Sequence, residues 1–107
     1  MGYSGSMKAL ILALAALVAS PVSAFEADPS IVVARWYYDD MFNWVAFDVV
    51  GDIRDQGSNT AQCVAFDATG APVAVALVML ASGNGVFTEA GAQAESIETI
   101  RCRRVSL

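Results

Sequence analysis

The stretch Trp44–Val73 reads WVAFDVVGDIRDQGSNTAQCVAFDATGAPV and decides the fold. Aromatic and β-branched residues in Trp44–Arg54 and Thr60–Asp67 predict two β-strands. Between them, Asp55–Asn59 has the composition of a turn, and the DATG segment that ends the second strand fits a type I turn. The stretch therefore predicts consecutive strands joined by short polar turns.

Further strand candidates follow at short, regular spacing along the rest of the chain. They share apolar, β-branched or aromatic residues between turn segments, and they are Ile31–Tyr38, Pro72–Leu80, Val86–Thr88 and Ala94–Val105. Ala90–Thr99 stays open between strand and helix, because Ala, Gln and Glu favour helix. The pattern predicts an all-β fold, a small immunoglobulin-like antiparallel β-sandwich of about six or seven short strands.

The first 24 residues have the pattern of a secretory signal peptide. Met7-Lys8 supplies a positive charge, Ala9–Ala19 is an unbroken apolar run, and Val22-Ser23-Ala24 supplies small residues for cleavage. The run of about eleven residues is shorter than the roughly 20 residues of a membrane-spanning helix. We therefore expect cleavage after Ala24, leaving one domain of residues 25–107 that is exported to the periplasm or outside the cell and is not inserted in a membrane.

Cys63 and Cys102 are the only cysteines, and both lie in the part of the chain expected to be exported. An oxidising compartment lets disulfides persist, so the sequence predicts a bond between them. The alternative is a pair of buried thiols. A disulfide would support a domain of about 83 residues, whose core alone gives marginal stability.

The expected domain is acidic: residues 25–107 contain five arginines, no lysine and eleven acidic residues, a net charge near −6. Nucleic-acid binding depends largely on cationic contacts to phosphate, so this balance argues against a nucleic-acid partner. A basic partner protein is compatible with it. Arg101, Arg103 and Arg104 surround Cys102, and we expect them on a solvated outer strand face. The alternative is that they pair with a partner's carboxylates or with the domain's own acidic residues.

Ile31–Tyr38 and Trp44–Arg54 are expected to form a hairpin closed by Asp39–Asn43. If Tyr38 faces Trp44, the period of two gives the hairpin two faces. The predicted core face carries Ile31, Val33, Tyr37, Val45, Phe47, Val49 and Ile53. The opposite face, which we expect to meet solvent or a partner, carries Val32, Ala34, Trp36, Tyr38, Trp44, Ala46, Asp48, Val50 and Asp52.

Five aromatic residues fall within nine positions of this hairpin: Trp36, Tyr37, Tyr38, Phe42 and Trp44. Exposed aromatic rings with hydrogen-bonding edges are typical of protein interfaces and of surfaces on which sugars stack. We therefore take Trp36, Tyr38, Phe42 and Trp44 as the candidate partner-binding residues. The alternative is that cross-strand aromatic pairs stabilise the hairpin, or that the second sheet covers this face.

Two segments resemble the FxLYD family of exported immunoglobulin-like domains. They are Val50-Gly51-Asp52-Ile53-Arg54-Asp55 and Cys63-Val64-Ala65-Phe66-Asp67-Ala68-Thr69-Gly70. Phe66-Asp67 and Gly70 correspond to the family's aromatic–Asp strand end and turn glycine, whereas Asp55 stands where the family has Asn. Within the motif that names the family only Asp67 is kept, with Phe66 in place of Tyr, Ala65 in place of Leu and Cys63 in place of the leading Phe. The resemblance implies an immunoglobulin-like sandwich with an accessory or binding role, and it carries no catalytic residues.

The chain contains no histidine, which excludes Ser-His-Asp and Cys-His triads and removes the commonest metal ligand. The remaining acid–base candidates are carboxylates: Asp39-Asp40 in the hairpin loop, and Asp48 and Asp52 on one strand face. We expect these to be solvated surface acids, with a cation contact or catalysis as alternatives. The sequence predicts no catalytic residue, cofactor or metal site.

Three classes of function remain. The one we favour is a non-enzymatic binding or accessory module that contacts another protein through the aromatic hairpin. The second is a small hydrolase with two carboxylates facing each other in a pocket, one of them buried. The third is a structural envelope component without a discrete site. A homodimer is compatible with an uncovered edge strand at Pro72–Leu80.

Overall fold

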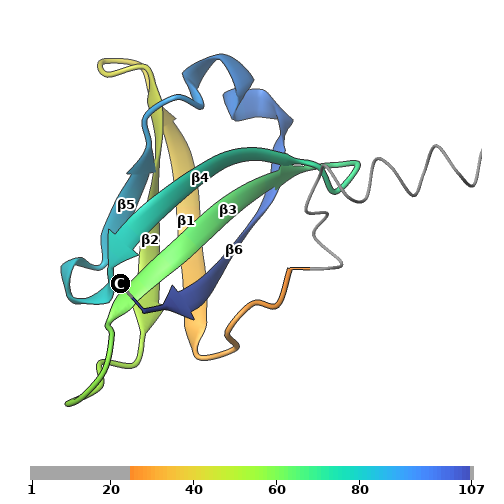
Figure 1. Ribbon diagram of the computed structural model, residues 1–107. Coiled ribbons are helices and arrows are strands. Elements are labelled where there is room, and N and C mark those ends of the chain that lie inside the picture. Colours follow the sequence, from red (N-terminus) through yellow and green to blue (C-terminus); the bar gives the residue numbers. More distant parts are fainter. Residues whose placement is uncertain (1–24, 107) are drawn as a thin grey trace, which may run out of the picture.

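The computed structural model describes residues 25–106, which form two three-stranded antiparallel sheets (Figure 1). The first sheet has the order β1-β2-β5, with β1 at Ile31–Asp39, β2 at Trp44–Gly51 and β5 at Asn84–Phe87. The second has the order β4-β3-β6, with β4 at Pro72–Met79, β3 at Thr60–Asp67 and β6 at Ile97–Val105. Two short 3-10 helices, η2 (Leu80–Ser82) and η3 (Gly91–Ser96), precede β5 and β6.

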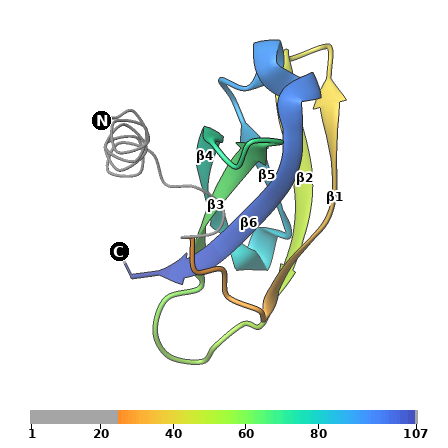
Figure 2. The same ribbon diagram turned by 90° about the vertical axis from the view of Figure 1, so that its right-hand side faces the viewer.

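The expected all-β sandwich is confirmed. Figure 2 shows β3 and β4 on one side of the molecule and β1 and β2 on the other. In both sheets the central strand, β2 or β3, pairs with the strand next to it in the chain and with a later strand, β5 or β6. The predicted signal peptide, residues 1–24, lies outside the described residues, so cleavage and export stay predictions.

The core lies between the sheets and follows the alternation of their central strands. β2 contributes Val45, Phe47 and Val49, and β3 contributes Ala61, Cys63 and Ala65. Phe47 stacks on Phe87 of β5 with ring centroids 4.6 Å apart. Burial of each large apolar side chain contributes about 1.5–3 kcal/mol, so the central strands hold the two sheets together.

Gly85 allows β5 to approach the core closely. A Cβ at this position would lie 2.6 Å from a methyl carbon of Val78 and 2.7 Å from the Phe47 ring. These distances are far below van der Waals contact, so any larger residue would push β5 away from β4. Glycine is therefore the residue that this packing requires.

β3 is buried on both of its faces. Val64 and Phe66 point away from the core, yet both are buried. Phe25, in the segment before β1, packs edge to face on Phe66 with ring centroids 5.7 Å apart. The start of the described chain thus covers part of the outer face of the second sheet.

The predicted disulfide between Cys63 and Cys102 is present. The two residues lie directly opposite each other on β3 and β6, so the bond links neighbouring strands of the second sheet and does not join the two sheets. The sequence separation is 39 residues, and closing a loop of that length stabilises the fold by about 4 kcal/mol in the chain-entropy model.

The predicted end of the second strand was wrong. β2 ends at Gly51, and Ile53, which was placed on the core face, is exposed. The chain leaves the sheet because the next segment forms its own polar loop. In that loop Asn59 accepts the Arg54 N–H at 2.8 Å and donates its side-chain N–H to the Arg54 carbonyl at 2.9 Å.

Ala90–Thr99, which the sequence left open between helix and strand, contains both: a short helix first and then the start of a strand. Gly91–Ser96 forms η3, and the strand predicted from Ala94 begins only at Ile97. Ala, Gln and Glu favour the short helix, and β6 then buries Ile97, Ile100 and Cys102, with a register shift between Ile97 and Thr99. The residues that favour helix therefore form a helix of only six residues.

A β-bulge in β1 changes which hairpin residues share a face. Val33 pairs with Val49, but Arg35 already pairs with Asp48, so Ala34 is the extra residue on β1. A shift of one residue moves every later side chain of the strand to the opposite face of the sheet. The predicted faces hold before the bulge and are reversed in β1 after it.

The predicted pairing of Tyr38 with Trp44 was therefore wrong. Tyr38 pairs with Val45, and Asp39 pairs with Trp44. Tyr37 was predicted to lie in the core, but it points outward and is exposed. The reason is that the sequence pattern alone does not reveal the bulge that sets this register.

Candidate functional site

Polar contacts hold the end of the β1–β2 hairpin in one conformation. The Met41 N–H donates to Asp39 Oδ1 at 3.0 Å, and the Tyr38 hydroxyl donates to Asn43 Oδ1 at 2.7 Å. Asn43 has a φ of 54°, a left-handed conformation that asparagine tolerates in turns. η3 packs against this loop so closely that a Cβ at Gly91 would collide with the Asn43 carbonyl. The loop is thus supported from both sides.

The predicted partner-binding residues gather at this hairpin end but do not share one face. Trp36 and Tyr38 lie on the side of β1 that faces the core, because of the bulge. Trp44 lies on the outer side, where Phe42 stacks on it with ring centroids 4.6 Å apart and planes at 23°. Tyr37 joins Trp44 on the outer side. The single aromatic face expected from the sequence is therefore split in two.

Large apolar side chains are exposed on both sides of the hairpin end. The exposed fractions are 38% for Trp36, 48% for Tyr37, 47% for Tyr38, 81% for Met41 and 57% for Phe42. The second sheet does not cover these residues. The stack of Phe42 on Trp44 is an aromatic contact within the hairpin, as the alternative expected, and partner binding stays a prediction. We call these five residues and Trp44 the hairpin aromatic surface.

The inner side of the hairpin aromatic surface borders a hollow of about 260 Å³. Tyr38 forms one wall, and η3 forms the other through Gly91, Ala92, Ala94 and Glu95. Small residues, glycine and alanine, dominate this lining. Among the residues that line it, only Tyr38 and Glu95 have polar side chains, so the hollow has few groups that could bind a ligand by hydrogen bonds or charge.

The outer side carries a second hollow, of about 210 Å³, that spans β1, β2 and β5. Its lining combines aromatic rings, carboxylates and an amide with small residues between them. The members are Tyr37, Asp39, Trp44, Ala46, Phe47, Asp48, Asn84, Gly85 and Val86. We call it the outer hollow. Because three paired strands build it, its side chains start from a rigid backbone.

An ion pair lies at the outer hollow. Arg35 Nε donates to Asp48 Oδ2 at 2.6 Å, and the guanidinium carbon lies 5.4 Å from the centroid of the Tyr37 ring. The hydrogen bond with Asp48, and then its negative charge, raise the pKa of Arg35. Asp39 and Asp48 are both only partly buried. This chemistry suits the binding of a charged or polar group.

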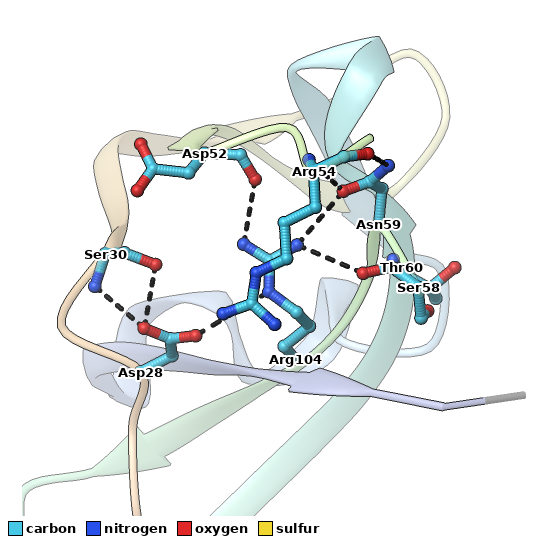
Figure 3. Close-up of polar contacts among 8 residues, drawn as sticks. All are labelled: Asp28, Ser30, Asp52, Arg54, Ser58, Asn59, Thr60 and Arg104. Carbon is cyan, nitrogen blue, oxygen red and sulfur yellow. Dashed lines mark hydrogen bonds and ion pairs between the residues drawn. The ribbon is translucent and has the colours of Figure 1, made fainter. Parts of the chain in front are cut away.

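Arg104, which was expected on a solvated face, instead makes three side-chain hydrogen bonds and one ion pair. Its Nη2 donates to the Asp52 carbonyl at 2.8 Å, and its Nη1 donates to the Ser58 carbonyl at 3.1 Å and to Asn59 Oδ1 at 3.2 Å (Figure 3). Its Nε lies 3.8 Å from Asp28 Oδ2. Arg104 thus ties the segment before β1 and the loop between β2 and β3 to β6.

The expectation that Arg104 lies on a solvated face was wrong, since its side chain is only 8% exposed. It pairs with Ala61 on the core-facing side of β6, whereas Arg101 and Arg103 point outward and are exposed. The signal was present in the sequence: Arg104 lies two residues after Cys102, and strand alternation places both on one face. This cluster supports the fold and presents no open site.

Asp28 is the acidic end of the same cluster. Its Oδ1 accepts the Ser30 N–H at 2.9 Å and the Ser30 hydroxyl at 2.8 Å (Figure 3). These bonds, led by the backbone N–H, lower the pKa of Asp28, and the positive charge of Arg104 adds to the effect. The turn before β1 is therefore held most firmly when Asp28 is ionised.

A second exposed apolar surface lies on β4, the edge strand of the second sheet. Val75, Leu77 and Met79 point away from the core and are exposed. We call these three residues the β4 stripe. Its three side chains are aliphatic, and of these Val75 borders a smaller hollow of about 160 Å³ that Gln62 and Arg103 also line, without a carboxylate.

Neither ligand-like clusters nor known proteins assign a function to this chain. Within residues 25–106, no three His, Cys, Asp or Glu side chains gather in a way that could hold a metal ion. In the same part of the chain, no helix has the length and apolar character needed to cross a membrane. Comparison of the chain with protein-family models, curated proteins and solved structures gave no match, so the proposals below rest on surface geometry.

Proposed function

We propose that this protein is an exported, non-enzymatic binding module that contacts another protein through the hairpin aromatic surface. The observation that carries the proposal is the exposure of five large side chains around one hairpin end. Aromatic residues and methionine are enriched at the centres of protein interfaces. Concentrated exposed apolar surface on a small domain is typical of an interaction site.

Preorganisation of the hairpin supports this function. Asn43 is held by the Tyr38 hydroxyl and packs against Gly91 of η3. Side chains presented by an ordered loop lose less conformational entropy on binding than those of a mobile loop. The Cys63–Cys102 disulfide is compatible with an oxidising compartment, which supports export.

The carboxylates favour binding over the alternative of hydrolysis. Asp39 and Asp48 line one hollow, but neither is buried, and Asp48 is paired with Arg35. A glycosidase needs one carboxyl whose pKa is raised by burial. The expected placement of Asp48 and Asp52 on one strand face was wrong, because β2 ends at Gly51.

Site-specific cross-linking tests the proposal directly. The full chain is produced with a photoreactive benzoylphenylalanine in place of Phe42, and its intact mass shows whether residues 1–24 have been removed. Illumination in an envelope extract is expected to give a discrete cross-linked species. That species should be lost when Tyr37→Ala is added and be competed by unlabelled protein, because a specific interface depends on few central residues.

The matched control carries the same photoreactive group at Leu77, an exposed residue of the β4 stripe on the other sheet. Cross-links from position 42 but not from position 77 support binding at the hairpin. Identical products from both positions, or products from position 42 that Tyr37→Ala leaves unchanged, would contradict the proposal. Thermal unfolding of each variant shows that the fold is retained.

A further inference from the structure

The outer hollow brings together the two kinds of group that hold a guanidinium. Tyr37 and Trp44 contribute aromatic rings, and Asp39 and Asp48 contribute carboxylates, to a hollow of about 210 Å³. A guanidinium stacks on aromatic faces and donates paired hydrogen bonds to carboxylates. Ala46 lies among these larger residues on β2 and leaves space above the sheet.

Arg35 shows how this surface holds a guanidinium. It combines a hydrogen bond of 2.6 Å to Asp48 with a position 5.4 Å from the centroid of the Tyr37 ring. Arg35 and Asp48 pair across β1 and β2, so the contact is made at one edge of the hollow. Asp39, the other carboxylate, lies on the same side of β1 as Arg35 and Tyr37, because every second residue of a strand points to the same face of the sheet.

We propose that the outer hollow receives an arginine side chain of a basic partner protein. The inference rests on the proposed function and names the chemistry of the partner. The guanidinium lies against Tyr37 and Trp44 and donates to Asp39, whose Oδ1 already accepts the Met41 N–H. A carboxylate has further acceptor sites on its second oxygen, so both bonds can be made together.

Charge complementarity supports a basic partner. Residues 25–107 contain five arginines and eleven acidic residues. Opposite charge on two proteins raises the rate of encounter and fixes their relative orientation. Arginine fits better than lysine, because its planar group stacks on a ring while donating in the same plane.

A tryptophan reporter in the hollow provides the test. Trp36→Phe leaves Trp44 as the single tryptophan, since the chain has only two. The fluorescence of Trp44 is followed while N-acetyl-arginine amide, N-acetyl-citrulline amide or methyl glucoside is added to the full-length protein. Citrulline amide has nearly the same shape as arginine amide but carries no charge, and the glucoside tests the alternative of a sugar-stacking surface.

Two neighbouring aspartates provide a matched pair of variants. Asp39→Asn and Asp40→Asn remove the same charge from adjacent positions, but only Asp39 lines the outer hollow. Arg35→Gln is the third variant. It removes the guanidinium that now occupies Asp48, so Asp48 becomes available to the added arginine.

We expect arginine amide to bind with a dissociation constant on the order of 1 mM, and citrulline amide and the glucoside to bind at least about tenfold more weakly. Asp39→Asn should weaken arginine binding by about fivefold or more, and Asp40→Asn should change it by less than about twofold. Arg35→Gln should strengthen it. Equal responses to arginine and citrulline, a stronger response to the glucoside, or equal effects of Asp39→Asn and Asp40→Asn would each overturn the inference.

Failure of the inference can be distinguished from failure of the proposed function. If cross-linking at position 42 succeeds but arginine amide shows no preference over citrulline amide, a protein binds the hairpin without an arginine in the outer hollow. If arginine amide binds as expected but cross-linking gives no specific product, the proposed protein-binding function is contradicted. The assignment of a basic partner protein is then contradicted too, because it rests on that function.

Discussion

The two sheets differ in how their strands are held and covered. In the second sheet, β3 is buried on both faces, a disulfide joins it to β6, and Arg104 ties β6 to the neighbouring loop. In the first sheet, β1 buries only Ile31 among its nine residues, and the outer side of β1 and β2 forms an aromatic hollow. The second sheet thus acts as a scaffold, and the first presents side chains.

The comparison shows that exposed apolar area does not by itself identify a site. The β4 stripe and the hairpin aromatic surface are both exposed. Only the hairpin surface combines rings with carboxylates and an amide around a hollow, and only that combination gives directional contacts. The predictions below test this division between a scaffold sheet and a presenting sheet.

Removal of the disulfide tests the scaffold most severely. We expect Cys63→Ala/Cys102→Ala to lower the free energy of unfolding by about 4 kcal/mol, because the unfolded chain regains the entropy of a loop that spans 39 residues. Urea denaturation measures this difference. A loss below about 1 kcal/mol would show that packing alone holds the second sheet.

Removal of the Arg104 side-chain charge is the next largest test. Arg104→Met should lower the free energy of unfolding by about 2–3 kcal/mol, because the Asp52 and Ser58 carbonyls and the Asp28 carboxylate lose their shared partner. Arg101→Met, at an exposed position of the same strand, should change it by less than about 0.5 kcal/mol. Equal effects of the two substitutions would refute the role assigned to Arg104.

The presenting sheet should tolerate changes that remove its exposed rings. Phe42→Ala loses the stack on Trp44, which is worth about 0.5–1.5 kcal/mol, and should leave the cooperative unfolding transition intact. Thermal melts and near-ultraviolet circular dichroism provide the measurement. Loss of cooperative unfolding would mean that the aromatic surface is part of the scaffold.

Acid should lower the stability of the fold through Asp28 and Asp67. The fold lowers the pKa of Asp28 and of Asp67, chiefly through the bonds from Ser30 to Asp28 and from Thr69 to Asp67. Each group therefore stabilises the fold above its ordinary pKa of 3.8, and that stabilisation is lost as pH falls through the lower pKa of the folded state.

The measurement is the midpoint of urea unfolding between pH 6 and pH 2.5. We expect the urea concentration at the midpoint to decrease as the pH is lowered below about 4. Asp28→Asn should make this dependence of the midpoint on pH less steep, because the substituted side chain no longer titrates. Asp40→Asn, in the exposed hairpin loop, is the control and should leave the slope unchanged. A slope that Asp28→Asn does not alter would exclude Asp28 as a source of the acid sensitivity.

The smallest effect on stability is expected at the β4 stripe. Leu77→Lys should change the free energy of unfolding by less than about 0.5 kcal/mol, because Leu77 is mostly exposed. It should also reduce any self-association at high concentration, since a charge on an edge strand opposes pairing with another chain. Analytical ultracentrifugation measures this. A homodimer that persists in Leu77→Lys would place the dimer interface elsewhere.

The sequence alone determined the all-β class, most strand positions and the disulfide. These features depend on local patterns: β-branched and aromatic runs, turn residues such as Asp67-Ala68-Thr69-Gly70, and a single possible cysteine pair. The turn formed as predicted, with the Gly70 N–H donating to the Asp67 carbonyl at 3.0 Å. The aromatic composition of the candidate site was also evident from the sequence.

Only the tertiary structure decided which of those aromatic residues lie together. The bulge at Ala34 reverses the later faces of β1, and it arises from how β1 pairs with β2, which no local pattern reveals. The outer hollow needs Asn84 from β5, and the Arg104 cluster joins residues more than 40 positions apart. Strand propensity is a property of neighbours in the chain, whereas register and surface shape depend on neighbours in space.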